Sequence, residues 1–269
     1  MARCQVRGVD LDVEVSGVGI PTLVWGHGLT SNREHENRGA LLDWTRFGNQ
    51  CTTVRYDARG HGRSDTSSDP TTFSWRSLAE DQLALADALG IERYVAAGAS
   101  MGCGTALHAA VLAPHRVQAL ILAIPPTAWE SRQERVAIWA QMADLVERRG
   151  IDALIESSAA IPPPDPLVGR HDVLDENERN LRETDPHRLA AVFRGAGHAD
   201  LPARDDVAAI MAPTLILAWT GDTGHPVSTA QQLCDLMPHA ELVVAGTADE
   251  LSTWTDLANG FIARVAADA

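Results

Sequence analysis

Short apolar runs rich in β-branched residues alternate along the chain with longer segments whose apolar residues recur at helical spacing. Continuous apolar runs bounded by turn residues are typical of strands that are buried on both faces. Six such strands are predicted, at 22–25, 52–56, 94–97, 117–124, 214–219 and 241–245. Helices are predicted at 78–89 and 101–113. The pattern therefore predicts an α/β fold, a mostly parallel central sheet with helices on both faces.

One long stretch, residues 127–204, breaks this rhythm because it contains no convincing strand. Helical segments are predicted around 129–149 and 186–195. The proline-rich run 162–166 cannot lie inside a helix, so it is expected to connect two helical pieces. We therefore expect a helical cap, residues 127–204, inserted into a core that is formed by residues 1–126 and 205–269.

The balance of charge narrows the choice of partners. The 269 residues include 22 Lys and Arg against 36 Asp and Glu, a formal net charge of −14. Nucleic acids and anionic membrane surfaces are bound by clustered basic residues, so neither is expected as a partner. The uncharged stretch 95–114 approaches the length of a membrane span, but its glycines and polar residues indicate a turn between two buried elements. A small-molecule substrate is the expected partner, and no particular oligomeric state is predicted.

The four cysteines carry no metal or disulfide signature. Cys4, Cys51, Cys103 and Cys234 are scattered, with no C-x-x-C spacing. The charged start of the chain is not typical of a signal peptide. We therefore expect free thiols, no metal, no organic cofactor and a cytoplasmic location.

The most informative motif is Gly98-Ala99-Ser100-Met101-Gly102, between a predicted strand and a predicted helix. In this G-x-S-x-G context the glycines allow a sharp turn that places the serine hydroxyl at its tip. The first N–H groups of the following helix favour negative charge at the same point. The segment lacks the lysine and spacing of a phosphate-binding loop, so a catalytic serine is the better interpretation.

These motifs resemble those of the α/β-hydrolase fold family over almost the whole chain. Residues 27–30 (His-Gly-Leu-Thr) resemble the family's oxyanion turn, 56–64 its second signature turn and 98–102 its nucleophile elbow. The resemblance implies that Ser100 is the nucleophile and that the backbone N–H groups of Leu29 and Met101 form the oxyanion hole. Because the elbow carries Ser rather than Asp, the haloalkane dehalogenase and epoxide hydrolase branches are not expected.

The acid of a catalytic triad is predicted in the loop after strand 214–219. The family keeps this acid in a D-x-x-x-P pattern, which Asp222 matches together with Pro226. An aspartate beside glycine also commonly caps its own turn, and that structural role is the alternative interpretation.

The triad base is missing from its usual position. The family places Gly-His after the last strand, whereas this chain reads Gly246-Thr247, with no histidine after His239. His225 is the leading candidate because it follows Asp222 by three residues in the same loop. The alternative is a turn histidine bonded to backbone. His35 and His198 are weaker candidates, for which a surface position is the simpler explanation.

The tryptophans suggest what the site accepts. Seven Trp stand against four Phe and two Tyr. Four of them fall near the predicted carboxyl edge of the sheet or in the cap, where open α/β folds bind ligands: Trp25, Trp129, Trp139 and Trp219. A flat or apolar substrate fits such walls, although ordinary core packing explains any single tryptophan equally well.

Two hypotheses of function follow. The first is a serine hydrolase that acts on a small apolar ester, thioester or lactone through an acyl-enzyme on Ser100. The second is a non-hydrolytic protein of the same fold, either a biosynthetic lyase or cyclase or a ligand-binding pseudoenzyme. The missing late histidine is the feature that keeps the second hypothesis open.

Overall fold

The computed structural model describes residues 2–39, 41–47 and 51–267. Its centre is an eight-stranded sheet with the order β1-β2-β4-β3-β5-β6-β7-β8. Strands β3 to β8 are parallel to one another, and β1 and β2 are antiparallel. The strands are β1 Ala2–Val6, β2 Val9–Ser16, β3 Thr22–Gly26, β4 Thr52–Tyr56, β5 Tyr94–Ala99, β6 Val117–Ala123, β7 Thr214–Trp219 and β8 Ala240–Ala245. All six predicted strands are confirmed.

The antiparallel hairpin β1–β2 is absent from the prediction. Its turn is formed by Arg7 and Gly8, both at positive φ. Apolar side chains alternate along β2, where Val9, Leu11 and Val13 are buried. Strands of antiparallel sheets commonly alternate in this way, so a search for continuous apolar runs passes over them.

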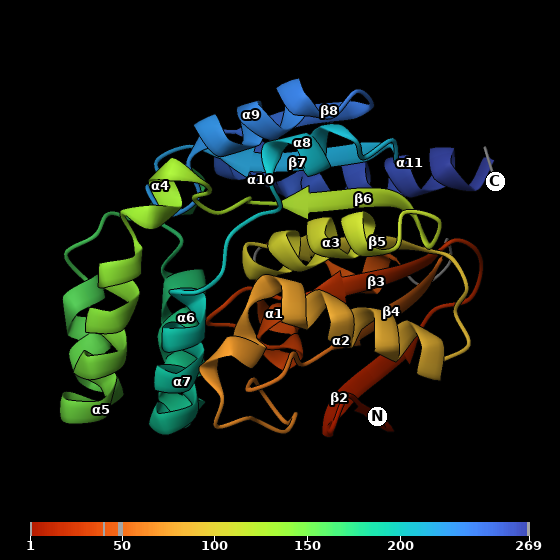
Figure 1. Ribbon diagram of the computed structural model, residues 1–269. Helices are drawn as coiled ribbons and strands as arrows, with labels where there is room; N and C mark the ends of the chain where they lie inside the picture. Colours follow the sequence, from red (N-terminus) through yellow and green to blue (C-terminus); the bar gives the residue numbers. More distant parts are fainter. Residues whose placement is uncertain (1, 40, 48–50, 268–269) are drawn as a thin grey trace.

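Helices cover both faces of the sheet (Figure 1). They are α1 Arg33–Arg38, α2 Trp75–Ala88, α3 Met101–Leu112, α4 Glu130–Gln133, α5 Val136–Ser158, α6 His171–Glu183, α7 Pro186–Ala196, α8 Arg204–Ala208, α9 Val227–Leu236, α10 Ala248–Ser252 and α11 Trp254–Ala267. Short 3₁₀ turns add η1 Trp44–Arg46, η2 Pro70–Phe73 and η3 Asp165–Leu167. Apolar side chains of α2, α3 and α9 pack on one face of the sheet and those of α11 on the other.

Residues 127–204 contain helices and no strand. Helices α5 and α7 share a small apolar core of their own, in which Val146 and Leu154 pack with Leu189 and Phe193. Figure 1 shows α5, α6 and α7 together at one side of the molecule, next to the end of the sheet toward which the β6 arrow points. Helix α6 was not predicted, and α5 is longer than expected, with a kink at Gly150. The boundaries between core and cap stay a prediction.

Within the described residues, no helix combines the length and the apolar character needed to cross a bilayer. The uncharged stretch 95–114 folds as most of β5, the turn at Ser100 and α3. The cytoplasmic location stays a prediction from the sequence.

Candidate active site

Ser100 stands at the turn between β5 and α3 with a strained backbone, at φ 52° and ψ −108°. Such a conformation is costly for a residue with a side chain, and it is typical of a nucleophile elbow. The turn closes tightly because Gly98 and Gly102 leave no space for a side chain. A Cβ atom would lie 2.6 Å from the Gly26 carbonyl oxygen at Gly98 and 2.0 Å from it at Gly102. These glycines therefore let β3, β5 and α3 meet beneath the serine.

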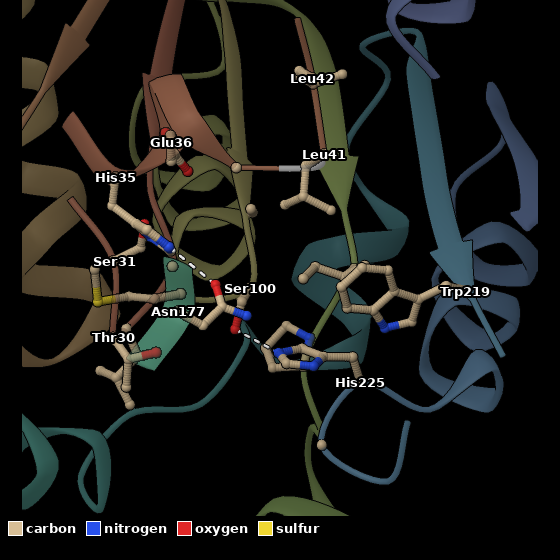
Figure 2. A pocket seen from close by; sticks show the side chains of 18 of the residues that line it. Thr30, Ser31, His35, Glu36, Leu41, Leu42, Ser100, Asn177, Trp219 and His225 are labelled. Carbon is tan, nitrogen blue, oxygen red and sulfur yellow. Dashed lines mark hydrogen bonds between the residues drawn. The ribbon is translucent and has the colours of Figure 1, made fainter. Parts of the chain in front are cut away.

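A continuous chain of hydrogen bonds joins Ser100, His225 and Asp222. The Ser100 hydroxyl lies 2.7 Å from His225 Nε2. On the other side of the ring, His225 Nδ1 lies 2.7 Å from Asp222 Oδ2. Figure 2 shows Ser100 and His225 pointing toward each other. With the proton of the neutral ring on Nδ1, the imidazole donates to the carboxylate and accepts from the hydroxyl, the geometry that a general base requires.

The Asp222 carboxylate is held from several directions. Its Oδ2 accepts from the Trp219 indole N–H at 2.9 Å, and its Oδ1 accepts from the Gly224 amide at 2.7 Å. Burial raises the pKa of Asp222, but the hydrogen bond and electrostatic interaction with His225 and the hydrogen bonds from Gly224 and Trp219 outweigh this effect. The pKa of this carboxyl is therefore well below its usual range, and the group is an anion that can orient the imidazole.

The other two candidate histidines lie away from Ser100. His35 does line the same cavity, but its Nδ1 lies 2.8 Å from Ser31 Oγ and its Nε2 lies 3.0 Å from Asn177 Oδ1. His198 is exposed after α7 and does not line the cavity. Neither is hydrogen-bonded to the Ser100 hydroxyl among the described residues.

The loop after β8, where the family usually carries its histidine, instead caps the N-terminus of α10. Thr247 is the N-cap residue of α10, in a capping box in which Glu250 accepts from the backbone N–H of Thr247 at 3.0 Å. Glu250 also accepts from the Gly246 amide at 2.8 Å. Residues 246–254 do not contribute to the described cavity wall. The imidazole at the serine comes from the same loop as the carboxylate.

Two backbone N–H groups are available beside the serine. Leu29 and Met101 line the cavity together with Ser100. Among the described residues, no hydrogen bond engages the Leu29 amide, and Met101 opens α3, where an N–H has no intrahelical acceptor. His61 Nε2 lies 2.8 Å from the Leu29 carbonyl oxygen, which ties this turn to the second signature turn. His61 is thus part of the turn structure.

The cavity above Ser100 has a volume of about 360 Å³ and mostly apolar walls. Three of the four tryptophans assigned to substrate binding line it: Trp25, Trp139 and Trp219. The prediction for Trp129 is wrong, because this residue is not part of the described cavity wall. Its indole N–H donates to the Pro202 carbonyl at 2.9 Å, and Arg204 lies 4.3 Å from its ring centroid.

Several cavity residues were missed by the sequence analysis. They come from segments that are distant in the chain, and they are Glu36, Trp44, Trp75, Arg132 and Asn177. No motif or spacing in the sequence marks them. Within the described residues, no cluster of His, Cys, Asp or Glu side chains is arranged to hold a metal ion.

Glu36 is an acid in a mostly apolar wall. Its Oε2 accepts from the Trp25 indole N–H at 2.8 Å. Burial raises the pKa of Glu36 to about 8, although the bond from Trp25 opposes this shift. The side chain is therefore a neutral carboxylic acid at neutral pH.

Glu36 makes the stability of the protein depend on pH. Because its pKa is higher in the folded than in the unfolded chain, the native state binds the proton more tightly, and this stabilisation is lost as the pH rises through about 8. We expect the free energy of unfolding, relative to the Glu36→Gln variant, to fall between pH 5 and 9. Urea unfolding of both proteins across this range measures it. Parallel stability curves would contradict the assignment.

Comparison with known proteins places these features in a family. A sequence model described as the alpha/beta hydrolase fold matches residues 21–154. The 3-oxoadipate enol-lactonase 1 of Acinetobacter baylyi is 30% identical over 231 residues, which cover 83% of this chain and 79% of the relative. The chain belongs to the alpha/beta hydrolase fold family.

Further similarities agree with this assignment. A protein of Pseudomonas savastanoi pv. phaseolicola, provisionally named carbamate hydrolase RutD, is 28% identical over 264 residues, 94% of this chain and 92% of the relative. The crystal structure of the enol-lactonase from Burkholderia xenovorans aligns with a TM-score of 0.80 at 22% identity, covering 98% of each chain. The predicted fold class is confirmed, and the protein is a hydrolase of this family.

Proposed function

We propose that this hydrolase cleaves a small ester, thioester or lactone through an acyl-enzyme on Ser100. The observation that carries the proposal is the continuous hydrogen-bond chain from Ser100 through His225 to Asp222 at a mostly apolar cavity. A nucleophile, a base in contact with it and an acid that orients the base are the parts that acyl transfer requires.

In the first half of the reaction the Ser100 oxygen attacks the substrate carbonyl while His225 Nε2 accepts the hydroxyl proton. The negative charge that develops on the carbonyl oxygen is held by the backbone N–H groups of Leu29 and Met101, with the start of α3 behind them. One such donor contributes roughly 3 kcal/mol to the transition state. His225 then gives its proton to the leaving oxygen or sulfur as the bond to the acyl carbon breaks.

In the second half a water molecule takes the place of the leaving group. His225 accepts a proton from this water as it attacks the acyl carbon, and then returns the proton to Ser100 as the acid product departs. Asp222 stabilises the imidazolium in both halves and remains ionised. When the substrate is a lactone, the leaving oxygen stays tethered, so the product is a single hydroxy acid.

The choice of ester-type substrates is supported by the relatives and by the cavity. Relatives at 26–30% identity over most of the chain include two enol-lactonases, whose names state a lactone substrate. The walls include Leu41, Leu42 and Ile124 beside the tryptophans, which suits an apolar body. The non-hydrolytic alternative rested on the missing late histidine, and the contact of His225 with Ser100 removes that reason.

The test is covalent labelling with a fluorophosphonate, which reacts with activated serines. We expect labelling at Ser100, and no labelling of the Ser100→Ala variant. The matched control is Ser31→Ala, because Ser31 is also in the cavity wall and its hydroxyl is also hydrogen-bonded to a histidine, His35. This control should keep full labelling.

Labelling at Ser31, or none in well-folded protein over hours, would overturn the proposed nucleophile. Circular dichroism of the variants checks that each is folded. The Ser100→Ala change should itself leave stability within about 0.5 kcal/mol, because the hydroxyl contributes little packing.

A further inference from the structure

Arg132 is a buried cation in the cavity wall. Its relative exposure is 4%, and no carboxylate of the described residues forms an ion pair with it. A buried charge is normally paired with an opposite one. Burial lowers the pKa of Arg132 to about 10, so the guanidinium stays charged at neutral pH.

The hydrogen bonds of Arg132 leave part of the guanidinium free. Nε donates to the Ala199 carbonyl at 2.9 Å, and Nη2 donates to the Ala196 carbonyl at 2.7 Å. Nη1 forms no hydrogen bond with the described residues. It is also absent from the set of fully buried side-chain atoms that lack a hydrogen-bond partner, so part of its surface is accessible. The nitrogen therefore keeps contact with space that a ligand can enter, and the cavity is the space that Arg132 lines.

Two tryptophan rings hold the Arg132 guanidinium in place. Its guanidinium carbon lies 4.5 Å from the ring centroid of Trp75 and 5.3 Å from that of Trp139. The indole N–H groups of both rings are buried and have no acceptor in the described part of the chain. Both tryptophans also line the cavity. The two rings therefore fix the guanidinium at the cavity wall.

A second arginine belongs to the same wall. Arg135 lines the cavity, donates to the Thr223 carbonyl and forms no ion pair with the described residues. The one acidic residue in the described cavity wall is Glu36, which is neutral at pH 7. Asp200 is the carboxylate that influences Arg132 through space, but its Oδ1 accepts from the amides of Trp129 and Leu201. The charged side chains of the described cavity wall are therefore the two arginines, Arg132 and Arg135.

We propose that the substrate carries a carboxylate remote from the bond that is cleaved, and that Arg132, assisted by Arg135, binds this carboxylate. The inference rests on the proposed function and narrows its substrate class to ester-type compounds with an apolar body and an anionic end. Arg132 is then a specificity-determining residue, because it contacts the substrate away from the reacting atoms.

Two pairs of reporter esters test this, since the carboxylate can be on either side of the scissile bond. In the first pair the acyl group differs: mono(4-nitrophenyl) adipate and 4-nitrophenyl hexanoate. In the second the leaving group differs: 4-acetoxybenzoate and its methyl ester. In each pair the measured quantity is the ratio of kcat/KM for the anionic ester to kcat/KM for the neutral one.

We expect the wild-type protein to favour the anionic ester in at least one pair, and Arg132→Gln to lower this preference about 10- to 100-fold, the range for a hydrogen bond to a charged group. Arg132→Lys, which keeps the charge, should retain part of it. The matched control is Arg148→Gln. Arg148 is in the same cap, its side chain is 79% exposed and it does not line the cavity. This change should leave both ratios as they are.

The ratio separates substrate binding from a merely structural role. Because Arg132 holds two backbone carbonyls, its loss also lowers the amount of folded protein, but that loss affects both esters of a pair equally. Equal ratios in wild type and Arg132→Gln, with both esters hydrolysed, would overturn the carboxylate subsite and leave the proposed function standing. Failure to hydrolyse any of the four esters, together with no fluorophosphonate labelling, would overturn the proposed function itself.

Discussion

Replacing His225 with alanine should lower kcat for an activated ester by about a millionfold, as far as replacing Ser100 does, because members of a triad act as one unit. The Ser100→Ala/His225→Ala double variant should be little slower than either single variant. Asp222→Asn should cost about 10⁴-fold, since an amide favours the wrong tautomer of the ring. Steady-state rates of the four variants measure these effects.

The matched control for this series is His35→Ala. His35 is the other histidine of the described cavity wall, and it is hydrogen-bonded to Ser31 rather than to Ser100. Its loss should change kcat far less than the loss of His225. If His225→Ala turned over at nearly the wild-type rate, the relocated base would be wrong. A large loss of kcat in His35→Ala alone would identify His35 as the base instead.

Replacing Gly102 with alanine should both unfold and inactivate much of the protein. The added Cβ would lie 2.0 Å from the carbonyl oxygen of Gly26 and 2.6 Å from its carbonyl carbon. These are backbone atoms of β3, so no flexible side chain can move aside, and α3 must shift away from the sheet. We expect a loss of about 3 kcal/mol or more in the free energy of unfolding, the upper range for overpacking. Urea unfolding measures this loss, and the remaining folded fraction should hydrolyse esters slowly because Ser100 moves with α3.

A second glycine provides the control for this change. Gly260 is also within a helix, α11, and a Cβ atom built on it meets nothing within 4 Å. Gly260→Ala should therefore stabilise the protein by about 0.5–1 kcal/mol, because alanine is the better helix former. Equal stabilities of the two variants would show that the close approach of α3 to β3 is not the constraint inferred from the structure.

The sequence was sufficient for the six parallel strands because each is a short, mostly apolar or β-branched run with turn residues near its ends. It was insufficient for the hairpin β1–β2, because apolar and polar residues alternate along β2. Helix α6 was missed as well, because few of its side chains are buried: Val173, Glu176 and Asn180. An apolar periodicity is weak where a helix buries polar side chains.

For the candidate site, local motifs and the lining of the cavity differ in how far they can be predicted. The elbow around Ser100 and the loop holding Asp222 and His225 depend on neighbours within a few residues, so their spacing in the chain is informative. The cavity wall depends on how separate helices are rotated and stacked. Trp129 turns toward Pro202 and Arg204, whereas Trp75, which no motif marks, lines the cavity.

By itself the sequence determined the six parallel strands, the serine at its sharp turn and the short loop that contains both an acid and a histidine. These features are local, because backbone conformation and buried strands are set by residues that are close in the chain. Only the tertiary structure decided that His225 lies 2.7 Å from Ser100, from which it is separated by 125 residues. It also decided that Arg132 lines the cavity, where no carboxylate of the described residues forms an ion pair with it. Contacts of this kind follow from the packing of distant elements, and no spacing in the sequence encodes them.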